Sequence, residues 1–372
     1  MYFEFDDDQE EFRASLRRLL SERAPITRVR EIAETRGYDS ATWQLLTSDM
    51  GVPGIHVPEE LGGSGFGLLE TCVVVQELGR TLTPVPVITT IGALEAIRGL
   101  GSPSQQVELV PGLASGEAIG TLALSGNRDL DVDGATVRAS AEGDDHVLGG
   151  HVLWGRVDYV AFGHIADLLV VPALTPSGDA VALYVVEATA PGVTIESRET
   201  LDLTRPLASV ELSGASAQLL GSDQAAIVRV VDLVRILLAN EAIGSSKAVL
   251  EMAVDYAKQR VQFNRPIGSF QAIKHKCADM AIAIDSAEAT VMFASMSAAD
   301  ESPDLRLAAL MAKAQGSECL TLCASQNIQV HGGIGFTWEA DPHLYFRRAK
   351  AIEPLFGNKV YHNEMLADLV GI

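Results

Sequence analysis

The sequence predicts an α+β protein in which a helical amino-terminal region, a middle β region and a helical carboxy-terminal region follow one another. Three observations carry this prediction. Apolar residues recur at helical spacing in the first third of the chain, at strand spacing in the middle, and again at helical spacing towards the end. A chain of 372 residues has room for two or three domains. We place their boundaries at residues 1–115, 116–220 and 221–372.

The amino-terminal region contains two clear helical patterns separated by a turn-rich stretch. Phe12, Leu16 and Leu20 share one face of the first helix. The stretch 51–67 (GVPGIHVPEELGGSGFG) holds prolines and glycines that forbid a long helix. The residues directly after it, 68–78 (LLETCVVVQEL), form the next predicted helix.

The middle region, from Ala118 to about Ser216, consists of β-branched runs set off by Gly, Asp or Pro. Such short runs are typical of a small antiparallel barrel or sandwich. The predicted strands are ATVRASAE, HVLGGHVLW, DLLVVPAL, AVALYVVEA and ASVELSGA.

The carboxy-terminal region returns to long amphipathic helices. The first runs from about Ala225 to Gln262 and is broken at Asn264–Pro266. Two further helices cover roughly residues 270–298 and 304–329.

Composition excludes several classes of protein. The 28 Lys and Arg residues against 49 Asp and Glu give a net charge of −21, which argues against nucleic acid or an anionic membrane as the main partner. No apolar run approaches the roughly 20 residues that a membrane span needs. The first 25 residues lack an apolar signal core, so we expect a cytoplasmic location. The four cysteines show no zinc-like spacing, so we predict buried thiols and no metal site.

The chain resembles one protein family along nearly its full length, and three stretches show the resemblance. They are residues 50–80 (MGVPGIHVPEELGGSGFGLLETCVVVQELGR), 260–280 (RVQFNRPIGSFQAIKHKCADM) and 329–350 (QVHGGIGFTWEADPHLYFRRAK). In this order and near this spacing they resemble the acyl-CoA dehydrogenases. The resemblance implies an amino-terminal helical domain, a middle β domain and a carboxy-terminal four-helix bundle. It also implies FAD as cofactor, an acyl-CoA substrate and electron-transfer flavoprotein as acceptor.

The usual catalytic residue of that family is missing here. Its members remove the α-proton of a thioester with a glutamate while a hydride passes to the flavin. Aligning residues 347–362 without a gap places Phe356 where this glutamate usually stands and Asn358 where a threonine stands. Phenylalanine cannot accept a proton.

A second family position for the base, just before an arginine on the first long carboxy-terminal helix, is also empty. The arginine is Arg235, so the preceding residue is Val234. Two carboxylates remain as alternatives: Glu241, two helical turns further along, and Glu353 in the loop before Phe356. For Glu241 the simpler interpretation is a helix carboxylate that is satisfied inside the protein.

The two halves of the family's flavin site differ in this sequence. The stretch 120–139 lacks the family's Thr-Glu-Pro and Gly-Ser-Asp elements, and Arg156 replaces the threonine that follows Trp154, so the ring site of the same chain is dismantled. The motifs that bind the pyrophosphate and adenine end of FAD for an adjacent subunit are present. These predicted cofactor-binding residues are Arg260, Phe263, Phe270, Gln271, Gln329, Val330, Gly332 and Gly333.

A pair of residues that the family has near the entrance of its thioester-binding site is also present. Asp232 and Arg235 match it and are predicted substrate residues; three apart on one helix, they could instead form an ordinary ion pair.

The base and the flavin ring site are missing, whereas the motifs for the pyrophosphate and adenine end of FAD are present. This contrast predicts a subunit that contributes to the active site of another chain. It resembles the non-catalytic partner in heterotetrameric acyl-CoA dehydrogenases of actinobacteria, which implies an α2β2 complex with a homologous subunit and steroid-CoA thioesters as candidate substrates. Three alternatives remain. One is a self-sufficient homotetramer with a displaced base, and another is a different flavin reaction on the same fold, such as that of a monooxygenase or nitroalkane oxidase. The third is a structural subunit without FAD.

Overall fold

The computed structural model describes residues 4–35, 37–124, 130–141 and 150–372. It contains two compact units, which we describe separately. One comprises Met1–Thr35, Cys72–Pro84 and Arg235–Ile372, and the other comprises Arg36–Thr71 and Val85–Val234. Helices α4 and α7 therefore each contribute to both units. The division into three domains expected from the sequence remains a prediction.

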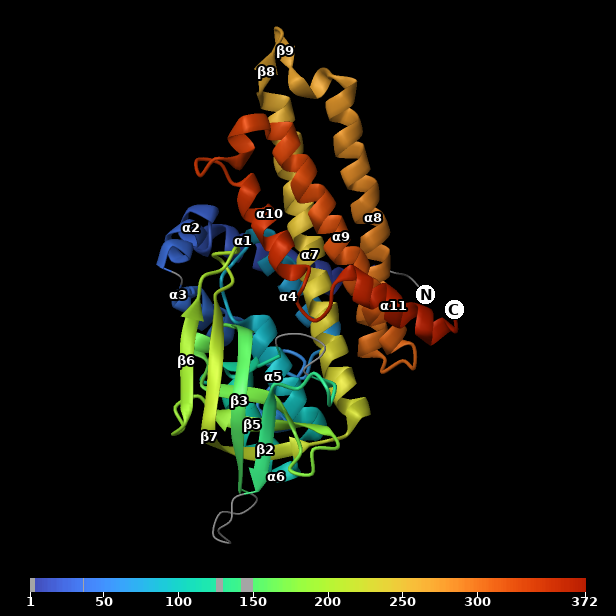
Figure 1. Ribbon diagram of the computed structural model, residues 1–372. Helices are drawn as coiled ribbons and strands as arrows, with labels where there is room; N and C mark the ends of the chain where they lie inside the picture. Colours follow the sequence, from blue (N-terminus) through green and yellow to red (C-terminus); the bar gives the residue numbers. More distant parts are fainter. Residues whose placement is uncertain (1–3, 36, 125–129, 142–149) are drawn as a thin grey trace. The chain divides into compact units, whose positions relative to one another are not determined.

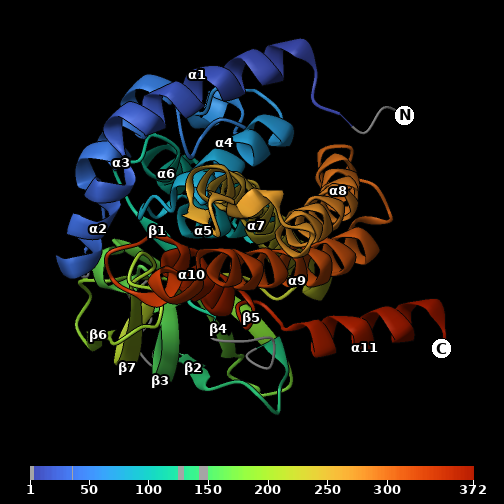
Figure 2. The same ribbon diagram turned by 90° about the horizontal axis from the view of Figure 1, so that it is seen from above.

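Long helices of the carboxy-terminal region form the first unit (Figures 1 and 2). Helices α7, α8 and α9 run alongside one another, and α8 and α9 pack together closely. The helices that contribute to this unit are α1 (Asp7–Arg23), α2 (Ile26–Thr35), α4 (Leu68–Thr81), α7 (Gln224–Gln259), α8 (Gln271–Ala299), α9 (Leu305–His331), α10 (Pro342–Ile352) and α11 (Lys359–Val370). These bounds confirm the three predicted carboxy-terminal helices.

The long helix α7 ends three residues earlier than the sequence predicts. After Gln259 the chain turns back in a hairpin of two short strands, β8 (Val261–Gln262) and β9 (Arg265–Pro266). The two residues between the strands, Phe263 and Asn264, both have positive φ angles, +52° and +61°. Two such residues form the tight turn whose twist suits a hairpin. The hairpin lies beyond the end of α7 and leads through the short 3₁₀ helix η4 (Ile267–Ser269) into α8 (Figure 1).

Helices α4 and α7 cross at backbone contact distance. A Cβ atom built on Gly244 of α7 would overlap the carbonyl of Gln76 of α4. Likewise, a Cβ on Gly79 of α4 would overlap the carbonyl of Glu241 of α7. The two glycines face each other's helices, and only glycine permits so close an approach.

A chain of buried polar side chains continues this crossing through four helices. Arg13 of α1 donates to Gln76 (2.7 Å), and Gln76 donates to Asn240 (2.8 Å). Asn240 in turn donates to Ser295 of α8 (3.0 Å). Because buried amide groups must be paired, this relay fixes how the four helices are rotated relative to one another.

The second unit combines short helices with a small barrel. The helices are α3 (Ser40–Met50), the 3₁₀ helix η1 (Glu59–Leu61), α5 (Val87–Leu100) and α6 (Pro103–Ala114). The strands are β1 (Gly120–Leu122), β2 (Val137–Ala141), β3 (Gly150–Ala161), β4 (Leu168–Leu174), β5 (Val181–Glu187), β6 (Val193–Arg198) and β7 (Leu207–Gly221). A 3₁₀ turn, η3 (Gly163–Ile165), joins β3 to β4.

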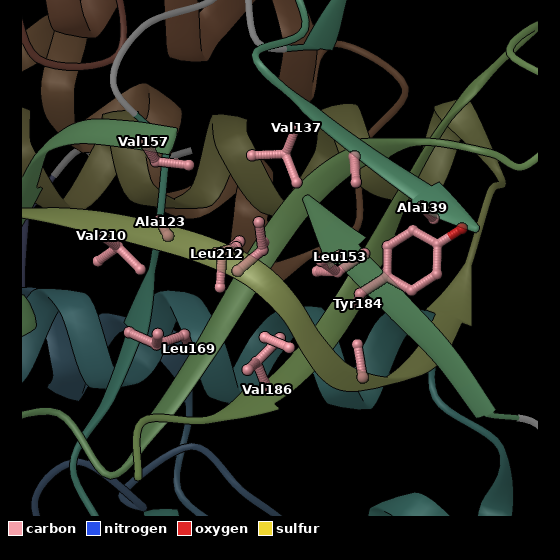
Figure 3. Close-up of a cluster of buried hydrophobic side chains, with 14 of the residues drawn as sticks. Ala123, Val137, Ala139, Leu153, Val157, Leu169, Tyr184, Val186, Val210 and Leu212 are labelled. Carbon is pink, nitrogen blue, oxygen red and sulfur yellow. The ribbon is translucent and has the colours of Figure 1, made fainter. Parts of the chain in front are cut away.

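The strand order shows how the sheet closes. It is β1-β4-β2-β3-β7-β5, and β5 also pairs with β4, so that five of these strands form a ring. Most pairs are antiparallel, whereas β4 runs parallel to β1 and β2. Figure 3 shows apolar side chains from several strands gathered inside it, among them Val137, Leu153, Leu169 and Val210. The barrel expected for the middle region is confirmed.

Two strands of the barrel unit, the short β1 and β6, were not predicted. Strand β6 pairs with β7 in register from Val193 opposite Leu212 to Arg198 opposite Leu207. Its sequence, VTIESR, has two charged residues within six, and its side chains are only partly buried. Such edge strands carry few of the apolar residues on which strand prediction depends.

Within the described part of the chain, no helix has the length and apolar character needed to cross a membrane. Cys72, Cys319 and Cys323 are buried free thiols, as the sequence predicts, whereas Cys277 is half-buried.

The crossing of α4 and α7 predicts a large loss of stability for Gly244→Ala. The added methyl group meets the backbone of α4, which cannot move away as a flexible side chain could, so we expect a loss of about 3 kcal/mol or more. Gly99→Ala, inside helix α5, is the control because its new methyl group has 3.9 Å to the nearest side-chain atom, on Val230. Denaturant unfolding of both variants measures the difference; an equal stability of the two contradicts the crossing.

Candidate functional site

The first group of predicted cofactor residues lies on the β8–β9 hairpin and at the start of α8. Arg260 is exposed, and 87% of the surface of Phe263 is accessible to solvent. The ring of Phe270 is half-buried, meets Phe263 edge to face at a centroid distance of 6.0 Å, and is covered by the guanidinium of Arg265 at 4.0 Å. Gln271 follows as an exposed first residue of α8. Cationic, aromatic and amide groups are thus presented outward.

The second group lies at the carboxy-terminal end of α9. Gln329, Gly332 and Gly333 are exposed, while Val330 is buried and anchors the turn. Gly332 has φ +67° and ψ −145°, a conformation essentially restricted to glycine. Apart from the adjoining backbone, no heavy atom of the described residues lies within 4 Å of a Cβ built on Gly332 or on Gly333. The backbone is therefore open to close approach at this turn.

A stacked pair of rings joins the two groups. The ring of Tyr256, four residues before Arg260, stacks on His331 at a centroid distance of 4.0 Å. The Tyr256 hydroxyl also donates to the carbonyl of His331 at 3.5 Å. The hairpin after α7 and the glycine turn after α9 consequently lie at the same end of the bundle (Figure 1).

The residues at this end of the bundle have the chemistry that a dinucleotide needs. A guanidinium can form paired hydrogen bonds to phosphate oxygens, amide side chains can donate and accept, and an exposed phenylalanine offers a ring for stacking. The open glycine turn lets main-chain atoms reach a ligand without a side chain between them. The donor set therefore fits the pyrophosphate and adenine end of FAD.

The loop in which the family's base was expected connects α10 to α11. Phe356 lies in it with a half-buried ring and φ +56°. The side chain of Asn358 accepts a hydrogen bond from the backbone N–H of Tyr361 (2.9 Å) and so caps the start of α11. Neither position carries an ionisable group.

Buried cationic groups hold the backbone of this loop. Arg235 donates from Nε to the carbonyl of Phe356 (2.9 Å). Lys313, which is fully buried, donates to the carbonyls of Ile352 (3.0 Å) and Gly357 (3.2 Å). Hydrogen bonds from charged donors are stronger than neutral ones, so the loop has a fixed backbone shape.

A buried histidine completes the contacts. His362 of α11 donates from Nε2 to the carbonyl of Gly357 (2.9 Å). Burial, with the charges of Lys313 and Arg235 as further causes, lowers the pKa of His362 to about 3. The imidazole is therefore neutral at physiological pH.

The two alternative carboxylates are both engaged in ion pairs. Glu241 is buried and pairs with Arg348 of α10, which is only 1% exposed. Glu353 pairs with Lys350 at 2.8 Å and is partly exposed. Both carboxylates therefore have an ionic partner within this chain.

The other predicted site residues lie in different settings. Asp232 and Arg235 on α7 are both about 1% exposed, and the guanidinium of Arg235 serves the Phe356 loop. Trp154 of β3 is 54% exposed and its ring lies against Gly214, while Arg156 pairs with Asp158 at 2.9 Å. Positions 125–129 of the stretch 120–139 lie outside the described residues.

Sequence reasoning did not find Lys313, His362 or Arg348. A lysine inside the apolar helix 305–331 is a signal that could have pointed to Lys313, because such a charge must find partners when buried. The partners themselves lie about 40 residues further along the chain. Nothing in the local sequence identifies them.

Comparison with known families covers most of the chain. Residues 6–117 match the acyl-CoA dehydrogenase N-terminal domain, and residues 225–370 match the acyl-CoA dehydrogenase C-terminal domain. Together with the fold and the paired cofactor motifs, these matches show that the chain belongs to the acyl-CoA dehydrogenase family. The expected enzyme class, an oxidoreductase acting on CH–CH bonds, and FAD as its cofactor are thereby confirmed at the level of the family.

Individual members of the family can also be compared with this chain. The chain is 35% identical to acyl-CoA dehydrogenase IpdE2 of Mycobacterium tuberculosis over 92% of its length and 91% of that protein. Among solved structures it resembles a variant of the Tcur3481–Tcur3483 steroid ACAD (TM-score 0.88, 31% identity, 98% of each chain). It also resembles the ChsE4–ChsE5 complex of M. tuberculosis (TM-score 0.90, 28% identity, 100% of this chain and 99% of that one).

The depressed pKa of His362 predicts a loss of stability in acid. Between about pH 6.5, where an unfolded histidine titrates, and about pH 3, the unfolded chain binds a proton that the folded chain does not. Neutral His362 therefore makes its full contribution to the free energy of unfolding above about pH 6.5. As the pH is lowered towards about 3, this free energy falls by about 1.4 kcal/mol per pH unit.

Denaturant unfolding across this pH range checks the prediction. We expect His362→Gln to flatten the dependence and His275→Gln, at an exposed position of α8, to leave it as in the unsubstituted chain. Identical slopes for His362→Gln and the unsubstituted chain contradict it.

The buried pair predicts that Glu241 contributes to stability. Replacing Glu241 by Gln leaves the Arg348 charge buried beside a neutral group, which we expect to cost about 3 kcal/mol in unfolding free energy. Glu251→Gln is the matched control, because Glu251 lies on the same helix, pairs with Arg80 and is 56% exposed. For this exposed pair we expect a loss below about 1 kcal/mol. Equal losses in the two variants would mean that the Glu241 pair is not structural.

Proposed function

We propose that this chain is the partner subunit of an α2β2 acyl-CoA dehydrogenase. In this proposal it lacks the catalytic base and contributes the pyrophosphate and adenine side of the FAD site to a homologous subunit. The homologous subunit provides the base and the flavin ring site. When bound, FAD supplies the hydride acceptor for oxidation of the acyl chain.

The observation that carries the proposal is the contrast between the two ends of the predicted site. The ungapped alignment assigns Phe356 to the position of the base, and the carbonyls of its loop are held by Arg235 and Lys313. By contrast, the residues predicted to bind the cofactor, Arg260, Phe263 and Gln329, are exposed on the surface of this chain. Exposed polar and aromatic groups around an open backbone turn suit a ligand that is shared with another subunit.

The engaged carboxylates support the same interpretation. A general base needs a carboxylate that can reach the substrate and change its protonation state. Glu241 is buried against Arg348, and Glu353 pairs with Lys350. A displaced base is therefore less well supported than a base supplied by the other subunit.

The substrate and acceptor follow from the relatives. Because one similar structure is described as a steroid ACAD, we propose a steroid-CoA thioester as the substrate of the complex. The second similar structure is a complex of two named components, ChsE4 and ChsE5, which supports the expectation of a homologous partner. Electron-transfer flavoprotein is the proposed acceptor. Asp232 and Arg235 remain the proposed substrate residues.

The flavin content of the purified protein tests the proposal. We expect the chain alone to contain little FAD and the complex with its homologous partner to contain about one FAD per pair of chains. Arg260→Ala should remove most of the FAD from the complex, because the guanidinium that meets the pyrophosphate is lost. Arg18→Ala, at an exposed position of α1, is the control and should leave the flavin content unchanged. The absorbance at about 450 nm, divided by the protein concentration, gives the ratio of FAD to protein.

Two outcomes would reject the proposal. About one FAD per chain in the chain alone, with turnover in the absence of any partner, indicates a self-sufficient enzyme. A complex whose flavin content does not change in Arg260→Ala means that this chain does not bind the dinucleotide.

A further inference from the structure

The segment from Gly332 to Asp341 needs external support to keep one shape. It begins as the short 3₁₀ helix η5 (Gly332–Phe336) and continues as irregular chain up to α10. Phe336 and Trp338 are 68% and 58% exposed. An irregular segment with side chains in water has many accessible conformations, and ordering it costs about 1–2 kcal/mol per residue. A turn at the start of such a segment can receive a ligand only if other contacts order it.

One arginine of a distant helix provides four hydrogen bonds to this segment. Arg30 of α2 donates from Nη1 to the carbonyl of Trp338 (2.7 Å) and from Nη2 to the carbonyl of Ala340 (2.6 Å). The same guanidinium donates from Nε (2.9 Å) and Nη2 (2.7 Å) to the carboxylate of Asp341. The two side chains are 24% and 31% exposed, so solvent screens the pair only in part. A single planar fork thus fixes three positions of the segment, which a lysine could not do.

One face of α10 contacts the aromatic side chains of the segment. The ring of Trp338 meets His343 edge to face at 4.7 Å, and the guanidinium of Arg347 lies 4.9 Å from its centroid. Phe336 packs against Phe346 at 6.4 Å. His343, Phe346 and Arg347 are three and four residues apart and therefore share one face of the helix.

The beginning of the segment is fixed where the two cofactor motifs join. His331, directly before Gly332, stacks on Tyr256, which leads into the Arg260 hairpin. Arg30 at one end and Tyr256 at the other therefore restrain the segment that carries the glycine turn.

We propose that Arg30 is a positioning residue for the pyrophosphate and adenine end of FAD. It holds the segment 332–341 in the shape in which the glycine turn and Gln329 are open to the dinucleotide, and it acts through this segment without touching the cofactor. This inference rests on the proposed function, because it assumes that FAD binds at the glycine turn. Preordering matters because a loop that must be ordered at the moment of binding lowers the affinity for the ligand.

Equilibrium titration of the flavin-free complex with FAD tests the role of Arg30. We expect Arg30→Ala to raise the dissociation constant for FAD about tenfold, the equivalent of about 1.4 kcal/mol of ordering that binding must then supply. Arg30→Lys, which keeps the charge but loses the fork, should lie between Arg30→Ala and the unsubstituted complex. Arg28→Ala is the matched control, because Arg28 lies on the same helix and pairs at 3.6 Å with the exposed Glu31. It should leave the dissociation constant unchanged.

Amide hydrogen exchange of the full-length chain without FAD separates positioning from general stability. In Arg30→Ala we expect faster exchange within residues 332–341 and unchanged exchange in α9. Asp341→Asn removes the charge of the acceptor and should give the same pattern to a smaller degree. It also provides the test if Arg30→Ala fails to fold.

The outcomes distinguish this inference from the proposed function. If Arg260→Ala weakens FAD binding and Arg30→Ala does not, Arg30 has no positioning role and the proposed function stands. If neither variant weakens binding, the proposed function fails. Faster unfolding or a lower melting temperature in Arg30→Ala without any change in FAD affinity or in exchange at 332–341 also overturns the inference.

Discussion

Backbone contact between α4 and α7 is the constraint on which the helical unit depends. Gly79 and Gly244 have no side chains, and this lets the backbones of the two helices touch directly. The relay from Arg13 through Gln76 to Asn240 then fixes the rotation of each helix, because every buried amide must keep its partner. Helix α7 carries Arg235 and Glu241 and ends just before Arg260. The placement of α7 therefore decides where these three residues lie.

Charge inside this unit is used to hold main-chain carbonyls and one carboxylate. Lys313 and Arg235 bind carbonyls of the loop after α10, and Arg348 of the same helix binds Glu241. A buried cation is costly unless it is fully hydrogen-bonded, so these groups stabilise the fold only in the arrangement observed. A loop that must satisfy them has little freedom to move, and its half-buried residue Phe356 is held with it. The segment after α9 is held in the same way, because the guanidinium of Arg30 donates to the carbonyl oxygens of Trp338 and Ala340.

Local patterns in the sequence predicted much of the fold. The change from helical to strand spacing and back gave the order of the regions, and the helix after residue 67 begins at Leu68 as expected. The hairpin after Gln259 was missed because its turn, Phe263–Asn264, lacks the glycine that usually marks such turns. The family motifs gave the exposed residues that are predicted to bind the cofactor, but not the contacts that support them. Arg30 and Asp341 are 311 residues apart, and no spacing rule connects residues at such a separation. Long-range polar pairs depend on the finished fold and cannot be derived from local periodicity.

The two adjacent glycines after α9 are under different kinds of constraint. Gly332 is required by the chain itself, because its backbone conformation, φ +67° with ψ −145°, strongly disfavours any residue with a Cβ. Gly333 is not among the residues with positive φ, and among the described residues no atom stands close to where its Cβ would be. The folded chain alone therefore gives no reason for glycine at position 333. In a survey of substitutions, tolerance at position 332 would report on folding, whereas tolerance at position 333 would report on whatever the chain meets from outside.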